Sequence, residues 1–464
     1  MTAVVRHRWK PTDVGFPGPS PRDMLRDFTS IRSDPLAFLV ETQRRHGDVV
    51  AFPVPGPPAL LLSDPRDVRQ VLQLGASRWG KDTVQYRALS RVTGTGLLAS
   101  DDPSWLRHRR AAAPAFHHQR LAAVATHVRV AARAGSAGWR DLRPGGQVVD
   151  VAPPLLAMAL DVVGRALFSA DLSSRSLRLI EATSDAARLI VSVGRSVLPL
   201  PPWVPSRTNR RLHAAARELD GLSRALIAQR RRTSGSAHGD DLLGLLIDAD
   251  LGDDEIRDEL VTMVVAGHET VAAALAWTLM LLAEDPPAQD RMRAEVSALG
   301  RDVPMVRSSA VVPWTRAVID ESLRLFPPAW VMSRRSTAPD RLGGRDVPAG
   351  TLAIISPWVV HRRPGSWADP LRFRPQRFLD GEGTVARADY LPFGLGPRLC
   401  IGRDFALGEM AVVLGELVRG FSFRTPSGWT RPRPEALSAA HPAGGMHLEV
   451  VPQGDGTPPP SPPC

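Results

Sequence analysis

Cysteine is almost absent from this chain of 464 residues, which holds only Cys400 and Cys464. Two cysteines exclude a disulfide framework and leave no set of thiols that could hold an iron–sulfur cluster. The first residues carry no apolar run of the kind found in a signal peptide or a membrane anchor. We therefore expect a reduced, cytoplasmic protein without a transmembrane anchor.

Lysine is nearly missing as well, because Lys10 and Lys81 are the only two and almost all of the positive charge is arginine. A formal net charge of +10 is compatible with nucleic acid, an anionic membrane surface or an acidic protein partner. It is equally compatible with basic residues scattered over a solvated surface. No nucleic-acid-binding signature accompanies the charge, so we expect no nucleic-acid partner.

Apolar residues are plentiful, at 43% of the chain, which is enough for an extensive core. A small β-rich region near the start, with a hairpin of strands over residues 49–54 and 59–63, is followed by mostly helical patterns. The sequence predicts a mainly α fold with a smaller β region (α+β). We expect an extended proline-rich lead-in over residues 1–34, a single domain over residues 35–450 and a disordered proline-rich tail over residues 451–464.

The most specific local pattern is the loop FGLGPRLCIG at residues 393–402. Its glycines and proline exclude regular helix before Cys400, and apolar residues at helical spacing follow from Arg403. A sulfur beside a helix start is favoured as a thiolate, the form that binds metal or attacks an electrophile. A lone cysteine is more often a small buried apolar residue, so the surrounding pattern has to decide between the two readings.

A second pattern lies in the middle of a long apolar segment, residues 253–285. A helix that is apolar all round is either core or membrane-spanning, and Glu269 at its middle argues against a span. Gly267, Glu269 and Thr270 are each costly in a buried helix, and such costs concentrate at functional sites, although any one of them could be structural. His268 points away from the face shared by Gly267 and Thr270, and we interpret it as structural.

These two patterns resemble those of one known family. Phe-x-x-Gly-x-Arg-x-Cys-x-Gly at Phe393–Gly402 is similar to the haem-binding signature of the cytochrome P450 family, and residues 266–270 (AGHET) resemble its oxygen-activating motif. The Glu-x-x-Arg pattern at Glu321 and Arg324 adds to the likeness. The resemblance implies a cytochrome P450 fold with haem b (iron protoporphyrin IX) between the central helix and the cysteine loop.

The resemblance also implies roles for the matching residues. Cys400 would be the axial thiolate of the iron, and the haem would be bound by Phe393, Gly394, Arg398, Gly402, Trp105, Arg109 and Arg335. Arg398, Arg335 and the Trp105–Arg109 pair would reach its propionates. Without that context, Trp105 and Arg109 also fit a basic surface helix with one aromatic anchor.

In the central helix the resemblance implies catalytic roles for four residues. Gly267 would leave room for dioxygen, and the helix would loosen near Ala266. Thr270 would offer a hydroxyl to the oxygen, and Glu269 would take part in proton delivery.

The resemblance assigns Glu321, Arg324 and Arg377 to the scaffold. Two residues depart from the family pattern, because Gln376 stands where glutamate is usual and Arg363 stands where aspartate is frequent. Both departures concern the scaffold, so they leave the haem assignment intact.

The implied activity is monooxygenation, in which one atom of O2 enters a C–H bond of a hydrophobic small molecule. Because the chain lacks a flavin or iron–sulfur segment, electrons would come from a separate ferredoxin and an NAD(P)H-dependent ferredoxin reductase. Arg107, Arg110 and Arg403 are candidates for docking an acidic ferredoxin. A peroxide-driven peroxygenase and a non-catalytic haem sensor are the alternatives.

The segment Thr83–Leu98 resembles the matching part of bacterial cytochromes P450 that hydroxylate β-carotene. It favours a carotenoid or another terpenoid as substrate, with steroids, fatty acids and polyketides as alternatives. The apolar, proline-broken residues 191–205 fit either a connector or a hydrophobic lip of the substrate cavity.

Overall fold

The computed structural model describes residues 15–54, 56–172, 176–194, 203–233, 238–300, 303, 311–379 and 388–453. Its α-helices are α1 (Pro21–Arg26), α2 (Phe28–Ser33), α3 (Pro35–His46), α4 (Pro65–Arg69), α5 (Val84–Thr93), α6 (Ser104–Ala112), α7 (His118–Gly135), α8 (Ala152–Phe168), α9 (Ser176–Gly194), α10 (Arg207–Thr233), α11 (Leu242–Asp248), α12 (Asp253–Glu284), α13 (Pro286–Ala298), α14 (Pro313–Leu325), α15 (Pro357–Val360) and α16 (Arg403–Gly420). The strands are β1 (Val49–Phe52), β2 (Ala59–Leu62), β3 (Trp79–Gly80), β4 (Gln147–Asp150), β5 (Met332–Ser336), β6 (Asp340–Leu342), β7 (Arg345–Val347), β8 (Leu352–Ile355), β9 (Phe421–Arg424), β10 (Pro434–Ala436), β11 (Ala440–Pro442) and β12 (His447–Pro452). The predicted mainly α fold with a smaller β region is confirmed.

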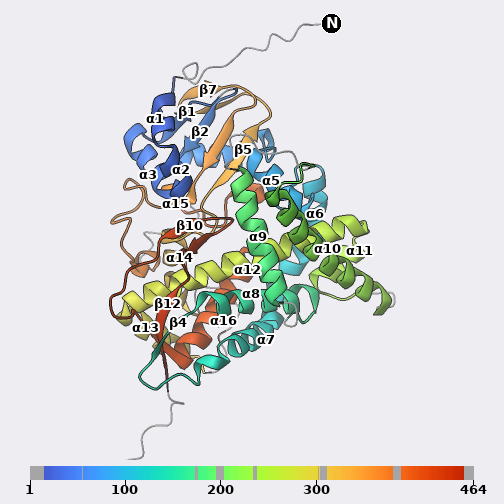
Figure 1. Cartoon of the computed structure of the whole chain (residues 1–464), viewed down its shortest axis with the longest axis vertical. Coiled ribbons are helices and arrows are strands. Elements are labelled where there is room, and N and C mark those ends of the chain that lie inside the picture. The colour runs from blue at the N-terminus through green and yellow to red at the C-terminus, as the bar shows by residue number, and fades with distance from the viewer. Residues whose placement is uncertain are drawn as a thin grey trace, which may run out of the picture.

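The largest sheet joins the start of the chain to a segment nearly three hundred residues later. Its order is β1-β2-β8-β5-β3, and only the β2–β8 pair is parallel. Leu62 pairs with Val49 on one side and with Ile355 on the other. Figure 1 shows this sheet and α1–α3 at one end of the molecule, with α12 running across the middle. The predicted hairpin is present.

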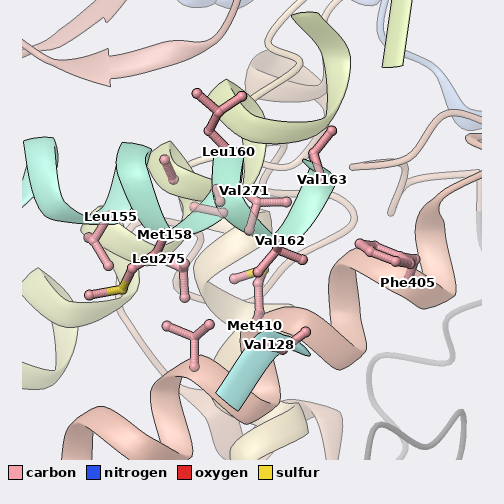
Figure 2. Packing of buried hydrophobic residues seen from close by; sticks show 14 of the residues in the cluster. Val128, Leu155, Met158, Leu160, Val162, Val163, Val271, Leu275, Phe405 and Met410 are labelled. Atoms are coloured by element: carbon pink, nitrogen blue, oxygen red, sulfur yellow. The ribbon is translucent and has the colours of Figure 1, made fainter. Parts of the chain in front are cut away.

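Helix α12 forms the centre of the hydrophobic core. Side chains of α8 and α16 pack against α12, and α7 packs against both of them, as Figure 2 shows for Val128, Met158, Val271, Leu275 and Met410. Each fully buried side chain of this size contributes about 1.5–3 kcal/mol. Among the described residues, α12 alone is long and apolar enough to cross a membrane, and 83% of its most apolar stretch is buried inside the protein. This agrees with its interpretation as a core helix.

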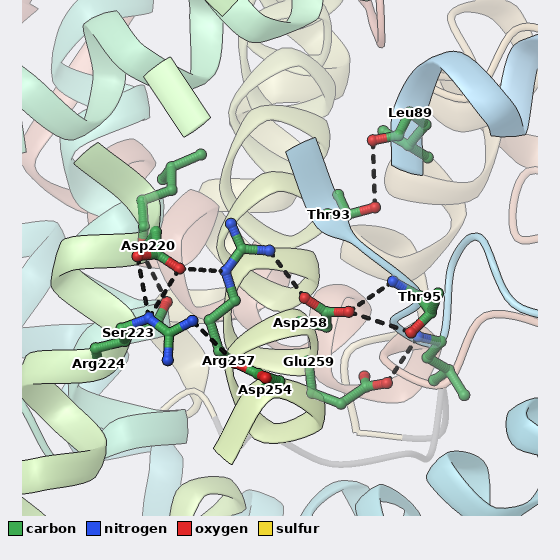
Figure 3. Close-up of polar contacts among 12 residues, drawn as sticks. Leu89, Thr93, Thr95, Asp220, Ser223, Arg224, Asp254, Arg257, Asp258 and Glu259 are labelled. Carbon is green, nitrogen blue, oxygen red and sulfur yellow. Dashed lines mark hydrogen bonds and ion pairs between the residues drawn. The ribbon is translucent and has the colours of Figure 1, made fainter. Parts of the chain in front are cut away.

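The first turns of α12 hold the segment that follows α5. Asp258 accepts a hydrogen bond from the Thr95 amide (2.6 Å), and Glu259 accepts one from the Leu97 amide (2.7 Å). Arg257 bridges Asp258 and Asp220 of α10 at 2.8 and 2.9 Å, as Figure 3 shows. Residues 83–98 are therefore tied to the helix that carries Glu269 and Thr270.

The structure corrects two predicted boundaries. Residues 21–33 form α1 and α2 instead of an extended lead-in, because Ser20 and Asp23 make a reciprocal cap and Pro21 takes the first helical position, where proline is favoured. Residues 451 and 452, which were assigned to a disordered tail, complete β12 against β9. The remaining tail, residues 454–464, and residues 195–202 of the predicted lip lie outside the described residues.

Candidate active site

The loop before Cys400 is closed by hydrogen bonds of its own backbone. The Cys400 amide donates to the Phe393 carbonyl at 3.0 Å, and Gly394 and Gly396 have φ angles of 75° and 73°, which favour glycine. A Cβ on Gly396 would lie 2.0 Å from the Leu72 carbonyl oxygen, so this glycine also permits close packing. The loop is thus held rigidly, and α16 begins at Arg403, close to where the sequence predicts it.

Many protein atoms surround the Cys400 side chain, although part of it is accessible to solvent. Burial raises the pKa of its thiol, while the Gly402 amide and the charges of Arg109 and Arg403 lower it. The net shift of the thiol pKa is upward. The helix start therefore does not by itself favour the thiolate, which differs from our expectation from the sequence. A metal ion that binds a thiol deprotonates it outright, so an iron at Cys400 would itself produce the thiolate.

One strip of α12 stands out from its buried surroundings. From Glu259 to Ala283, every residue is buried except Ala266, Gly267 and Thr270, which are three of the four residues proposed as catalytic. They lie at positions i, i+1 and i+4, and therefore on one side of the helix. The core helix thus carries one accessible strip, at the place where the sequence motif lies.

The contacts of this strip differ in part from what the resemblance implies. The Thr270 hydroxyl donates to the Ala266 carbonyl at 2.7 Å, but α12 stays helical there, so the expected loosening is not seen. A Cβ on Gly267 would lie 2.9 Å from Val163 Cγ2, so this glycine also lets α8 pack closely.

Glu269, the fourth proposed catalytic residue, is 2% exposed. Burial raises the pKa of its carboxyl group to about 7, although the Ser438 hydroxyl donates to Oε2 at 2.6 Å and, like the charge of Arg188, lowers it. A carboxyl group with a pKa near neutrality can both give and take a proton at physiological pH.

His268 is fully buried, with Nδ1 2.6 Å from the Val264 carbonyl and Nε2 3.1 Å from Thr183 Oγ1. Burial lowers its pKa to about 4, so the ring is neutral. One ring nitrogen has its partner on α12 itself and the other on α9. These contacts agree with the structural interpretation of this residue.

A cluster of basic side chains lies beside the cysteine loop. Arg398 stacks on the Trp105 ring at 4.0 Å and donates to Asp101 Oδ1 at 3.0 Å, and Arg109 donates to the Leu399 carbonyl at 3.1 Å. The structure therefore brings Trp105, Arg109 and Arg398 together around the loop, as the resemblance implies.

Two further basic residues belong to this cluster and were missed in the sequence. Lys81 is buried, and burial together with the charges of Arg334 and Arg398 holds its pKa well below the ordinary value. Arg334, also buried, donates to the Tyr86 hydroxyl at 3.1 Å. The only feature of the sequence that could have drawn attention to Lys81 was the scarcity of lysine in the chain. Buried like charges in such a group need an anionic partner.

Arg335 does not join this cluster. Its guanidinium donates to the Asp82 and Gly350 carbonyls, both at 2.9 Å. Successive residues of a strand point to opposite faces, so Arg334 of β5 takes the buried position and Arg335 the outer one. The role of Arg335 at the haem therefore stays a prediction, and the structure places the preceding residue, Arg334, in the cluster.

The predicted scaffold residues contact one another in the structure. Arg324 donates to both oxygens of Glu321 at 2.7 and 2.8 Å, and Arg377 Nε donates to Glu321 Oε1 at 3.2 Å, all three side chains being buried. The two departures from the family pattern have partners elsewhere. Gln376 accepts from Arg291 at 3.3 Å, and Arg363 pairs with Asp48 at 2.6 Å.

The family model for cytochrome P450 matches residues 17–448. The chain belongs to the cytochrome P450 family. It is 36% identical to cyclooctat-9-en-7-ol 5-monooxygenase of Streptomyces melanosporofaciens over 85% of this chain and 86% of that protein. It is 33% identical to cyclooctatin synthase of the same organism, over 90% of this chain and 91% of that protein. LUTEIN DEFICIENT 5, a chloroplastic protein of Arabidopsis thaliana, is 31% identical over 84% of this chain and 70% of that protein.

Solved structures of cytochromes P450 share the fold. The crystal structure of CYP175A1 from Thermus thermophillus superposes with a TM-score of 0.77 at 33% identity, covering 94% of this chain and all of that one. This cytochrome P450 is accordingly a monooxygenase of the haem-iron type, which uses O2 and redox partners and binds a hydrophobic substrate.

The residues present fit a haem. In the described part of the chain, no group of three or more His, Cys, Asp and Glu side chains could hold a metal ion. An iron that is bound by the ring nitrogens of a porphyrin needs only one axial protein ligand, and Cys400 is exposed at the start of α16. The cluster of Lys81, Arg109, Arg334 and Arg398 supplies cations for two carboxylates.

Proposed function

We propose that this cytochrome P450 hydroxylates an apolar terpenoid, with a carotenoid as the first candidate, on a haem b ligated by Cys400. The observation that carries the proposal is the accessible strip of Ala266, Gly267 and Thr270 in an otherwise buried α12. A hydroxyl and a nearby buried carboxyl group are suited to delivering protons during oxygen activation, which neither an electron carrier nor a haem sensor needs.

Each group of residues has a role in this proposal. When bound, haem supplies the binding and reductive activation of dioxygen. Cys400 holds the iron, while the basic cluster of Lys81, Arg109, Arg334 and Arg398 binds the propionates; here Arg334 replaces Arg335 in the assignment. Phe393, Gly394 and Gly402 shape the loop around the sulfur.

On α12, the Thr270 hydroxyl now donates to the Ala266 carbonyl. It can turn to donate to an oxygen atom beside the strip. Glu269, with its pKa raised to about 7, restores that proton.

The choice of substrate rests on two likenesses. Two relatives are named for cyclooctatin and cyclooctat-9-en-7-ol, and another is named for lutein, a carotenoid. The segment Thr83–Leu98, which resembles that of β-carotene hydroxylases, is anchored to α12 through Asp258 and Glu259. Both likenesses favour a long or polycyclic terpenoid over a steroid, a fatty acid or a polyketide.

We further propose a ferredoxin and its NAD(P)H-dependent reductase as electron donors, in the cytoplasm. Of the three basic residues expected to dock an acidic ferredoxin, Arg107 pairs with Glu255 and Arg403 pairs with Asp404 at 2.8 Å. Arg110 is exposed on α6. Charges that are already neutralised attract a partner less, so Arg110 is the main candidate for the interaction.

The test is turnover under isotopically labelled dioxygen. The holoenzyme is reconstituted with a ferredoxin and reductase and offered β-carotene and a cyclic diterpene alcohol, with palmitate as a fatty-acid control. We expect a substrate-induced shift of the haem spectrum and a hydroxylated product that contains one labelled oxygen atom. A shift and product with palmitate alone would contradict the terpenoid assignment. Full-rate turnover with peroxide alone would contradict the monooxygenase cycle.

A further inference from the structure

The buried carboxyl group of Glu269 receives a hydrogen bond from a distant part of the chain. Ser438 lies in the turn between β10 and β11, 169 residues later, and its hydroxyl donates to Glu269 Oε2 at 2.6 Å. Glu269 is 2% exposed, whereas Ser438 is exposed. The Ser438 hydroxyl therefore connects a buried acid to accessible surface.

The turn that carries Ser438 is held in place on two sides. Trp277, two turns after Glu269 on α12, donates from Nε1 to the Ala440 carbonyl at 2.7 Å. Trp330 Nε1 donates to the Leu437 carbonyl, also at 2.7 Å. Because α12 carries both Glu269 and one of these anchors, the helix itself sets the position of the serine relative to the acid.

Other polar groups near Glu269 do not offer the same contact. His441 Nε2 lies 4.0 Å from Glu269 Oε2, and burial lowers the pKa of His441 to about 4, so it is neutral at physiological pH and makes no ion pair. Arg188 of α9 acts on Glu269 through its charge, and neutral His268 points to Val264 and Thr183. Among the described residues, Ser438 is the side chain at hydrogen-bond distance from this carboxyl group.

We propose that Ser438 is a positioning residue that orients Glu269 and passes protons to it from the accessible side of the β10–β11 turn. In each transfer the hydroxyl gives its proton to Oε2 of ionised Glu269 and takes one from a water molecule, which is reprotonated by H3O⁺ from solvent, so the serine and the water end neutral and unchanged. A hydroxyl is suited to this because it donates and accepts at once. The inference rests on the proposed function, in which Glu269 delivers protons.

The experiment uses the holoenzyme and four variants. Ser438→Ala removes the hydroxyl, Ser438→Thr keeps it, Glu269→Gln removes the acid, and Glu435→Gln changes an exposed residue of the same hairpin as a control. The first readout is the infrared carbonyl band of protonated Glu269 in the resting protein as a function of pH, assigned by its loss in Glu269→Gln. The second is the fraction of reducing equivalents recovered as product instead of peroxide.

We expect Ser438→Ala to shift the carbonyl band and raise its midpoint pH, because the hydrogen bond that favours the ionised form is lost. The product fraction should fall by about tenfold. Ser438→Thr should restore both readouts, Glu435→Gln should leave both unchanged, and substrate affinity from the spectral shift should stay the same in all of these hairpin variants. A structural role alone would move affinity without moving the carbonyl band.

Two results would overturn the inference while leaving the role of Glu269 intact. In one, Ser438→Ala keeps the wild-type midpoint and product fraction although Glu269→Gln loses product. In the other, Ser438→Thr loses as much product as Ser438→Ala, which would show that the loss does not arise from removal of the hydroxyl. A different result, an unchanged product fraction in Glu269→Gln, would remove the proposed function of that acid and the serine's role with it.

Discussion

At the scale of single residues, the most unusual group is the carboxyl group of Glu269. It lies in the apolar core next to a neutral histidine, with the Ser438 hydroxyl as hydrogen-bond donor. Desolvation outweighs that bond and keeps the pKa near neutrality. The motif in the sequence pointed to Glu269, but its partner could not be predicted, because Ser438 is remote in the chain and lies in no recognisable pattern.

The stability of the folded protein should reflect this pKa. The folded state raises the pKa of Glu269 from 4.5 to about 7, so it binds the proton more tightly than the unfolded chain does. The contribution to stability is present below about pH 4.5 and is lost as pH rises through 7. A glutamine does not ionise, so Glu269→Gln keeps its stability as the pH rises. Its free energy of unfolding, relative to that of the wild type, should therefore increase by up to about 3 kcal/mol across this pH range. Chemical denaturation at several pH values measures the difference, and a pH-independent difference would contradict the account.

Whether Arg334 or Arg335 binds a haem propionate is also a question about single residues. Arg334→Ala should speed haem loss to an acceptor such as apomyoglobin by about tenfold or more, because a hydrogen bond to a charged group is worth about 1.5–3 kcal/mol. Arg335→Ala is the matched control and should leave the rate close to wild type, since its guanidinium bonds to the Asp82 and Gly350 carbonyls. The opposite order would restore the assignment made from the motif.

At the scale of elements, the sequence predicted some boundaries well for identifiable reasons. Acidic residues at the start and a proline after the end bound α12 at Asp253 and Glu284, as expected. Helices α1 and α2 were missed because the prolines nearby were interpreted as extended chain, although proline at the first helical position favours a helix. The motif could not show which of Arg334 and Arg335 faces the basic cluster, because the side-chain alternation of β5 depends on its register with neighbouring strands.

The packing of α14 against residues 374–378 depends on one buried ion cluster. Arg324→Met should leave Glu321 buried with Arg377 as its remaining cation and cost about 3–5 kcal/mol in the free energy of unfolding. Arg44→Met is the control, because Arg44 pairs with Glu41 on the surface of α3 and should contribute little. Urea denaturation of both variants measures these changes in the free energy of unfolding. Equal effects would show that the cluster is no more important than a surface pair.

At the scale of the whole molecule, the proposed haem site is assembled from segments far apart in the sequence. Lys81, Arg109, Arg334 and Arg398 come from the early and late parts of the chain, and they meet only in the folded structure. The motifs predicted the family correctly, and the roles of Cys400 and the other site residues stay predictions. Lys81 and Arg334 could not be predicted, because their proximity is a product of tertiary packing.

The distribution of charge over the surface of the protein should affect its reaction with an electron donor. Arg110→Glu should raise the KM for an acidic ferredoxin several-fold at low ionic strength, with a smaller difference at high salt because the charges are screened. Arg345→Glu, on β7 in another part of the fold, is the matched control. Stopped-flow reduction of the haem measures the effect. Rates that do not respond to salt or to either substitution would contradict docking through Arg110.

The central claim is that Cys400 binds the iron as a thiolate, and the carbon monoxide complex of the reduced holoenzyme tests it most directly. We expect the red-shifted Soret band typical of a haem with an axial thiolate, and we expect Cys400→Ala to abolish both this band and the oxidation of substrate. A wild-type Soret band at the position found with a histidine ligand, or a Cys400→Ala variant that keeps the red-shifted band and its activity, would contradict the account.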